Sequence, residues 1–408
     1  MIFHSSHFWH NKFFAFKIMH FSQIRDFFYE RGWKREIKEL YLSLGILRLA
    51  IAMVAVFEPI YLFNVFGSIP WLLFYLGLLF LALFFIYPLG GKFVCRFGFE
   101  HSFAFSIPAV FLYFVVINLL AKSLWFLAPL FVLSIIYKIL FWPATHSNLA
   151  HYGDQQKRGH QYGLFSGVIR ATRIVGPLLG GLVLYFFSFK VLFVVAATIS
   201  FLAIFPMFST KEEFASGFFP YKKCFLRIRD AYRPYKRKFF LSFLGFGEEI
   251  VSIMLWPLFI FLVVRNYASL GGIVSISSLF ALFFSLYIGK MVDKRDKRGK
   301  KTILSFGTAL YALLWPIRAF LTTVWGVFGA NVISANLTQV VYNPLVAFAY
   351  QKGDERGHLK YIIFLMMGIA AGKALMCFLL LLLILVFGLN WYLIFGVAGL
   401  WTLLYLFL

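Results

Sequence analysis

Nine charged side chains lie inside the long apolar runs of this sequence, and they are the residues best placed to do chemistry. They are Arg48, Glu58, Lys138, Arg170, Arg173, Glu248, Glu249, Arg318 and Lys373. Facing lipid, each would cost roughly 2.5–3.5 kcal/mol. Together they would cost on the order of 20–30 kcal/mol, which exceeds the stability of a typical domain. We therefore expect them to be paired or hydrated, with Arg318 reaching the membrane interface from the end of its run.

The acids among these residues suit proton transfer, because a carboxylate removed from water keeps its proton to a higher pH than an exposed one. Glu249 shares a small, polar helical face with Ser242 and Ser252. We therefore expect Glu249 to line a cavity, and Glu58 and Glu249 to be the residues that couple to protons. A fixed ion pair is the alternative for each acid.

Glu248 lies about 100° away from Glu249 on an ideal helix, among leucine and valine side chains. It is therefore expected to need a partner inside the bundle. Lys373 lies at a similar depth in its own run and is the predicted partner.

The N-terminal half carries an excess of cations at Arg48, Lys138, Arg170 and Arg173. They predict an electropositive cavity wall, which favours an anionic or zwitterionic solute. Pairing with Glu58 or a loop acid is the alternative. In the other half the amides of one helical face can bind a polar solute or hydrogen-bond to helices nearby. These amides are Asn336, Gln339 and Asn343.

Transmembrane helices must position these residues. The chain has 408 residues, of which 62% are hydrophobic and 13% charged, whereas soluble domains carry about 25% charged residues. This composition excludes both a soluble domain and a disordered chain. Twelve runs are long enough to cross a hydrocarbon core of about 30 Å. They are 41–64, 69–90, 101–120, 122–145, 164–187, 189–208, 239–264, 267–289, 302–320, 322–347, 361–388 and 390–408.

The formal net charge of +23 indicates membrane topology and not nucleic-acid binding. The basic residues concentrate in the segment 1–40 and in alternate loops, which predicts a multi-pass protein of the cell membrane with both termini in the cytoplasm. The segment 1–40 is expected to be a cytoplasmic arm containing an interfacial amphipathic helix, or else translation starts at Met19. The spacing of the three cysteines fits neither a metal site nor a disulfide framework, so no cofactor or metal is expected.

The two halves of the chain repeat each other. Gly353-Asp354 repeats Gly153-Asp154, Pro257 repeats Pro59, and Gly289 repeats Gly91, all at nearly the same spacing along the chain. This predicts a duplication with six-helix bundles at 41–208 and 239–408, joined by a cytoplasmic linker at 209–238.

These features resemble the major facilitator superfamily of secondary transporters over residues 41–408. The segment 91–98 is similar to the family's loop motif GxxxDRxG, with Cys95 in place of the aspartate, and the segment from Gly289 resembles its second copy. The loop after 122–145 and the run 176–181 resemble a further motif, which is commonest in exporters. The gating candidates are Gly91, Arg96, Gly98, Arg158, Asp293, Lys294, Arg295 and Arg356. Close helix packing is expected at Gly167, Gly176, Pro177, Gly180 and Gly181.

The resemblance implies an all-α membrane fold with twelve transmembrane helices in two parallel bundles. It also implies a monomeric secondary transporter of a small solute that works by alternating access, with proton coupling and export as further expectations. No nucleotide-binding P-loop occurs. Two alternatives stay open. One is a lipid-acting membrane enzyme, for which His146, His151 and His160 are the available groups, and the other is a transport-inactive scaffold, favoured by Cys95.

Overall fold

The computed structural model describes residues 35–151, 158–209, 219, 221, 225, 234–293, 295, 297–354 and 358–407. Within these residues every regular element is a helix. The N-terminal half holds α3 (Arg35–Ala55), α4 (Glu58–Phe66), α5 (Ile69–Phe97), α6 (Phe99–Leu119), α7 (Leu127–His151), α8 (Arg158–Phe186) and α9 (Phe189–Leu202). The C-terminal half holds α11 (Pro234–Leu244), α12 (Trp256–Val264), α13 (Tyr267–Asp293), α14 (Lys297–Arg318), α15 (Val324–Asp354), α16 (His358–Phe387) and α17 (Trp391–Thr402).

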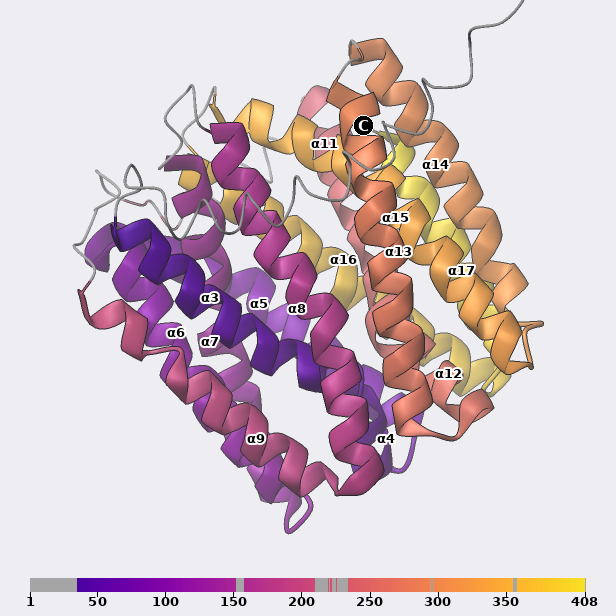
Figure 1. Ribbon diagram of the computed structural model, residues 1–408. Coiled ribbons are helices and arrows are strands. Elements are labelled where there is room, and N and C mark those ends of the chain that lie inside the picture. Colours follow the sequence, from indigo (N-terminus) through magenta and orange to yellow (C-terminus); the bar gives the residue numbers. More distant parts are fainter. Residues whose placement is uncertain are drawn as a thin grey trace, which may run out of the picture.

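The helices of each half gather on their own side of the molecule, as Figure 1 shows. The side on which α3 begins and the C-terminus lies is called the terminal side here. The opposite side carries the connections at residues 67–68, 120–126, 187–188, 265–266, 319–323 and 388–390. Most of the expected arm at 1–40 and most of the expected linker at 209–238 lie outside the described residues.

Nine helices of the described residues are long and apolar enough to cross a membrane, or ten if the bent pair α3 and α4 forms one span. Helix α14 falls outside this group because lysines and arginines occupy its first turns and Arg318 ends it. The last apolar stretch, Trp391–Phe407, is shorter than the others. The count of twelve spans therefore stays a prediction.

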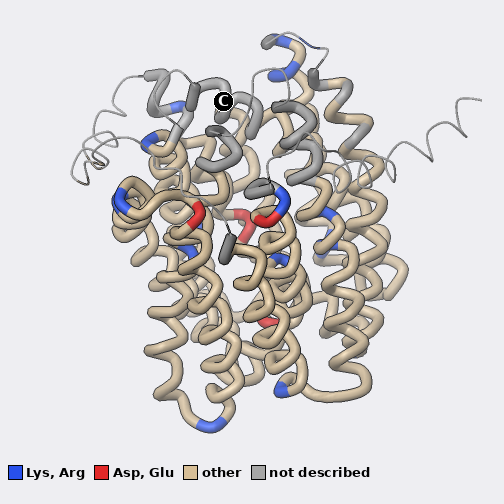
Figure 2. Tube along the Cα trace, turned by 60° about the vertical axis from the view of Figure 1, so that its left-hand side comes forward, with Lys and Arg blue, Asp and Glu red and all other residues tan. Residues whose placement is uncertain are grey.

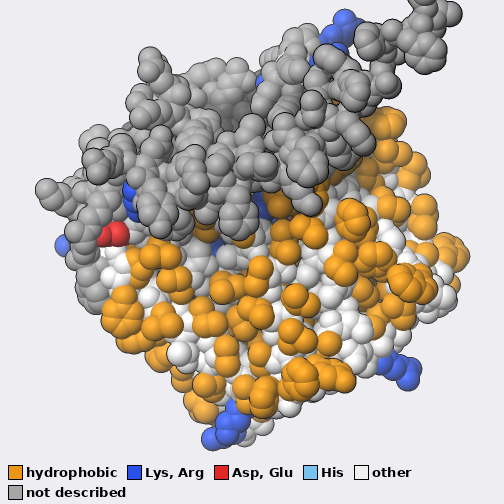
Figure 3. Space-filling view, in the orientation of Figure 1, with side chains coloured by type: hydrophobic (Ala, Val, Ile, Leu, Met, Phe, Trp, Pro, Cys, Tyr) orange, Lys and Arg blue, Asp and Glu red, His pale blue; other side chains and the backbone are white. Residues whose placement is uncertain are grey.

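The outer surface of the helices is apolar. Large side chains such as Phe105, Phe283 and Leu385 are exposed, and hydrophobic side chains cover the middle of the molecule in Figure 3. In Figure 2 the tube is tan over most of its length, with few charged residues between the two ends. This surface suits contact with lipid, and the chain is a multi-pass membrane protein.

Two helices are broken near their equivalent prolines, and Glu58, Glu248 and Glu249 lie at these breaks. Helices α3 and α4 meet at a 45° bend, where Pro59 lacks the N–H that would continue the helix. In the C-terminal half α11 gives way to a 3₁₀ segment at Gly245–Glu248, called η4, and then to a π-helical segment at Val251–Leu255, called η5, before Pro257 in α12. Glu58 therefore begins α4, and Glu248 and Glu249 lie where the regular helix is interrupted.

The two halves contact each other mainly along two helix pairs, α5 with α16 and α8 with α13. Small residues permit the close approach, because a Cβ on Gly77 would lie 2.9 Å from the Phe378 ring, and a Cβ on Gly271 would overlap the carbonyl oxygen of Pro177. The Tyr267 ring adds an edge contact with the Phe57 ring of the other half, at 6.3 Å between centroids. These contacts lie toward the opposite side, so the halves are sealed there.

The few described residues between the halves pack on α5. The Tyr221 hydroxyl donates a hydrogen bond to the Phe85 carbonyl oxygen at 3.1 Å. The Phe225 ring stacks on the Phe85 ring, and the Phe219 ring lies so close to Gly91 that a Cβ there would meet it at 2.7 Å. Aromatic side chains of the segment 209–238 thus attach it to the N-terminal half.

Candidate functional site

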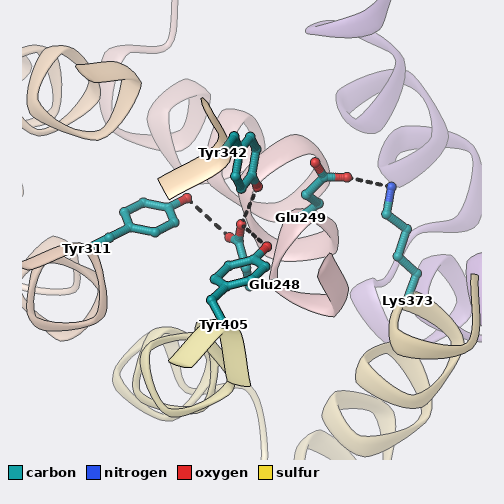
Figure 4. A network of polar contacts seen from close by, with 6 residues as sticks. All are labelled: Glu248, Glu249, Tyr311, Tyr342, Lys373 and Tyr405. Carbon is teal, nitrogen blue, oxygen red and sulfur yellow. Dashed lines mark hydrogen bonds and ion pairs between the residues drawn. The ribbon is translucent and has the colours of Figure 1, made fainter. Parts of the chain in front are cut away.

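Adjacent glutamates of the broken helix serve different partners, as Figure 4 shows. Glu248 is the last residue of η4, and Glu249 follows it directly. The Glu248 side chain points into the C-terminal half, whereas the Glu249 side chain points toward Lys373 on α16. The irregular backbone between α11 and α12 thus presents two carboxylates to two different environments.

Glu248 is fully buried and accepts hydrogen bonds from three tyrosine hydroxyls. The Tyr342 hydroxyl of α15 and the Tyr405 hydroxyl of the last 3₁₀ segment, η6 (Leu403–Phe407), donate to Oε1 at 2.7 Å and 3.4 Å. The Tyr311 hydroxyl of α14 donates to Oε2 at 3.1 Å. An ionised carboxylate accepts hydrogen bonds and donates none. These three donors therefore stabilise the ionised form of the carboxyl group.

Arg318 supplies the positive charge near this anion, without any contact with the membrane interface. It is fully buried, and its guanidinium lies 3.8 Å from the Trp315 ring centroid and 4.7 Å from that of Trp256. Its charge acts on Glu248. The expectation that Arg318 reaches the interface was wrong, because cation–π contacts with rings from two helices hold it inside the C-terminal half.

Glu249 forms an ion pair with Lys373, with 2.7 Å between Oε2 and Nζ. Both side chains keep some exposure, at 19% for Glu249 and 14% for Lys373. The Lys373 ammonium also lies 5.2 Å from the ring centroid of Phe80, which belongs to α5 of the other half. The pair therefore lies where the two halves meet.

The predicted partnership of Lys373 with Glu248 was wrong. The prediction assumed an ideal α-helix, but a 3₁₀ segment turns about 120° per residue and a π-helix turns less than an α-helix. The face predicted for Glu249 is accordingly interrupted, since Ser242 is buried whereas Ser252 is half-buried.

Glu58 has a similar environment in the N-terminal half. Its Oε1 accepts a hydrogen bond from the Tyr113 hydroxyl at 2.6 Å, and the charge of Lys138 acts on it. The Lys138 ammonium also lies 4.5 Å from the centroid of the Tyr137 ring. Tyr113 on α6 donates to Glu58, and Tyr311 on α14 donates to Glu248 in the other half. Neither tyrosine was predicted from the sequence, although the internal repeat aligns them.

Arg48 lies on α3, and Arg170 and Arg173 lie on α8. The Arg48 guanidinium lies 5.1 Å from the centroid of the Trp142 ring of α7, and the His146 ring stacks on the same indole at 5.4 Å. The charges of Arg48 and Arg173 act on each other. Arg170 is half-buried, one turn before Arg173 on α8.

The predicted amides of α15 are half-buried, and one of them is bound within its own helix. The Asn336 side chain donates a hydrogen bond to the Val332 carbonyl oxygen at 2.7 Å, while Gln339 and Asn343 follow along the helix. Asn331, which was not predicted from the sequence, accepts a hydrogen bond from the Trp256 indole at 2.9 Å.

The glycines of the packing motif on α8 differ in how closely other helices approach them. A Cβ on Gly176 would meet Ala52 of α3, and one on Gly181 would meet the Tyr267 carbonyl oxygen, each closer than real Cβ contacts. Gly180 lies against the Met53 carbonyl oxygen, and Pro177 is buried. A Cβ on Gly167, by contrast, would meet nothing within 4 Å among the described residues.

The gating role of the loop motifs stays a prediction. Gly98 ends α5 with a φ of +88°, Arg96 is exposed with its guanidinium 5.2 Å from the Phe97 ring, and Arg295 is exposed. The remaining gating residues have side chains outside the described residues. They are Arg158, Asp293, Lys294 and Arg356. The side chains of His151 and His160 are likewise outside, and in the described part no group of three or more His, Cys, Asp or Glu residues could hold a metal.

Comparisons with known proteins give one family. Residues 40–372 match the sequence profile of the Major Facilitator Superfamily. No curated protein sequence is significantly similar to the chain. A solved structure with a similar fold is that of a POT family transporter in complex with a thioalcohol-conjugated peptide, with a TM-score of 0.72 and 14% identity over 91% of this chain and 96% of that one. Because the profile covers most of its length, the chain belongs to the Major Facilitator Superfamily.

Proposed function

We propose that this protein is a secondary active transporter that moves a small solute across the cell membrane by alternating access of its two halves. The halves are six-helix bundles at 41–208 and 239–408 joined by the linker at 209–238, and both termini lie in the cytoplasm. The chain works as a monomer. The family membership supports transport, and the Glu249–Lys373 ion pair at the seam between the halves carries the mechanism.

The position of this pair links it to movement of the halves. Lys373 lies on α16 between Glu249 and Phe80 of α5. When the halves rock against each other, α5 slides relative to α16 and the surroundings of the Lys373 ammonium change. The strength of an ion pair depends on its exposure to water. Each orientation of the halves therefore sets a different energy for separating Glu249 from Lys373.

Proton coupling follows from this difference. When Glu249 takes up a proton, its negative charge disappears and Lys373 is released to interact with solute or water. Glu248, one residue away, stays bound by three tyrosines and is assigned a structural role. Export is the proposed direction, on the strength of the Gly176–Gly181 motif.

The test is transport in proteoliposomes, with and without an imposed pH gradient. Glu249→Gln is expected to abolish the dependence of transport on the gradient while leaving exchange of solute across the membrane in place. Lys373→Met is expected to do the same, because the pair then cannot form. Glu248→Gln is the matched control, since it removes the adjacent carboxylate and should lower stability rather than alter coupling in the folded fraction.

Three outcomes separate the alternatives. Glu249→Gln transport that still follows the pH gradient contradicts the coupling assignment. No movement of any solute by the folded wild-type protein favours a transport-inactive scaffold. Chemical conversion of a labelled lipid favours a membrane enzyme.

A further inference from the structure

Two arginines of the membrane-spanning helices, Arg48 on α3 and Arg173 on α8, lie near enough for their charges to act on each other. Three carboxylates of the membrane-spanning helices each have a cation whose charge acts on them or that pairs with them. Glu58 has Lys138, Glu248 has Arg318 and Glu249 has Lys373. In the described part of the chain, neither Arg48 nor Arg173 has an acidic partner of this kind.

Arg173 is exposed on an inward face of α8. At helical spacing it shares that face with Gly176, Pro177 and Gly180, which are buried against α3 and α13. The lipid-exposed residues Val175 and Leu182 lie on the other face. The exposed surface of Arg173 therefore borders the region between helices and not the surrounding lipid.

Arg48 approaches the same region from α3 and is held there. Its guanidinium lies over the Trp142 ring at 5.1 Å and over the Phe141 ring at 5.5 Å. These cation–π contacts restrict the guanidinium without neutralising it. Arg48 and Arg173 are close enough for their charges to repel, a cost that an anion between them would remove.

We propose that Arg48 and Arg173 bind the anionic oxygen group, carboxylate or phosphate, of the solute that this transporter carries. The proposal rests on the proposed function and gives it a substrate class. Guanidinium groups suit this task, because their planar donors match carboxylate and phosphate oxygens in bidentate geometry. Lys373 is already paired with Glu249. The two arginines of the N-terminal half therefore provide the positive charge that recognises the solute.

The experiment measures binding of two probes, succinate and inorganic phosphate, to the full chain in nanodiscs of neutral lipid by titration calorimetry. Succinamide, which is uncharged, is the control ligand. Wild-type protein is expected to bind at least one anion and not succinamide, and to bind more weakly as salt is added. Arg48→Gln and Arg173→Gln are each expected to weaken binding about tenfold or more. Lys122→Gln, which changes an exposed cation in the connection after α6, should leave binding unchanged.

Two further arms control for folding and for lipid. Arg173→Lys keeps the charge but loses the planar fork, so it should bind better than Arg173→Gln and worse than wild type. Thermal unfolding of every variant confirms that a loss of binding is not a loss of fold. Repeating the titration with anionic lipid separates two sources of phosphate, because a lipid headgroup at the site would displace the soluble probe.

Failure of this inference differs from failure of the proposed function. If neither anion binds, or if both Gln variants bind as wild type does, the assignment of Arg48 and Arg173 is overturned, even when proteoliposomes transport a neutral or cationic solute. If an anion binds through both arginines but no solute crosses the membrane, the site stands and the transporter proposal falls.

Discussion

The three tyrosine hydroxyls that donate to Glu248 should contribute unequally to the stability of the protein. The three hydroxyl–carboxylate distances are 2.7 Å for Tyr342, 3.1 Å for Tyr311 and 3.4 Å for Tyr405. Replacement by phenylalanine removes the hydroxyl and keeps the ring. The loss of free energy of unfolding should therefore follow the order Tyr342, then Tyr311, then Tyr405.

Two typical hydrogen-bond energies set limits on the expected loss of unfolding free energy. Hydrogen bonds to charged groups contribute about 1.5–3 kcal/mol, whereas hydrogen bonds between membrane helices average about 0.6 kcal/mol, with a maximum near 1.7 kcal/mol. Because Glu248 is fully buried, Tyr342→Phe should cost about 2 kcal/mol and Tyr311→Phe about 1 kcal/mol. Tyr405→Phe, at a distance where the bond is weak, should cost less than about 0.5 kcal/mol.

Removing the carboxylate tests the whole network. Glu248→Gln leaves the buried Arg318 guanidinium without its counter-charge, so it should cost about 3–5 kcal/mol. The double variant Glu248→Gln with Arg318→Met should cost less than the sum of the single variants, because their charges interact.

The assay is reversible unfolding in mixed detergent micelles, followed by circular dichroism. The reasoning is refuted if Tyr405→Phe costs as much as Tyr342→Phe. It is also refuted if Glu248→Gln unfolds like wild type, because the carboxylate would then not be the centre of the network.

Further predictions concern packing and Glu58. Gly180→Ala should destabilise the protein, because its Cβ would overlap the Met53 carbonyl oxygen, whereas Gly272→Ala, with open space around it, should melt like wild type; equal melting temperatures for the two variants would contradict this. Tyr113→Phe removes the 2.6 Å hydrogen bond to Glu58 and should cost about 1.5–3 kcal/mol of unfolding free energy, measured by the same unfolding assay. An unchanged unfolding curve for Tyr113→Phe would show that Glu58 does not depend on this hydroxyl.

Much of the architecture follows from local properties of the sequence. The apolar runs predicted the long helices, and their length is set by the membrane. The paired prolines Pro59 and Pro257 predicted equivalent positions in the two halves, and both lie at breaks in the structure. The high cost of charges in lipid predicted that the acids inside the apolar runs would have partners, and Glu58, Glu248 and Glu249 each have one.

The choice of partners could not be predicted in the same way. It depends on the 3₁₀ and π-helical turns around Glu248 and Glu249, which change the direction of each side chain without a clear signal in the sequence. It also depends on rings that are distant in sequence, such as Trp256 of α12, which lies 4.7 Å from the Arg318 guanidinium. The assumption of an ideal helix therefore gave the wrong partner for Lys373, and the place of Arg318 at the end of its run gave the wrong environment for that residue.

The most direct test of alternating access is a cross-link across the seam on the opposite side. Phe57 and Tyr267 belong to different halves and their rings touch. Cysteines at both positions, in a background without native cysteines, can be joined by a short thiol-specific reagent. Phe189 and Phe193, whose ring centroids are 6.0 Å apart within one half, provide the matched control pair.

The measurement is solute uptake into proteoliposomes before cross-linking, after it and after reduction. Alternating access predicts that joining positions 57 and 267 stops transport reversibly, while joining positions 189 and 193 does not. Normal uptake by protein with its two halves joined at positions 57 and 267 would contradict the account.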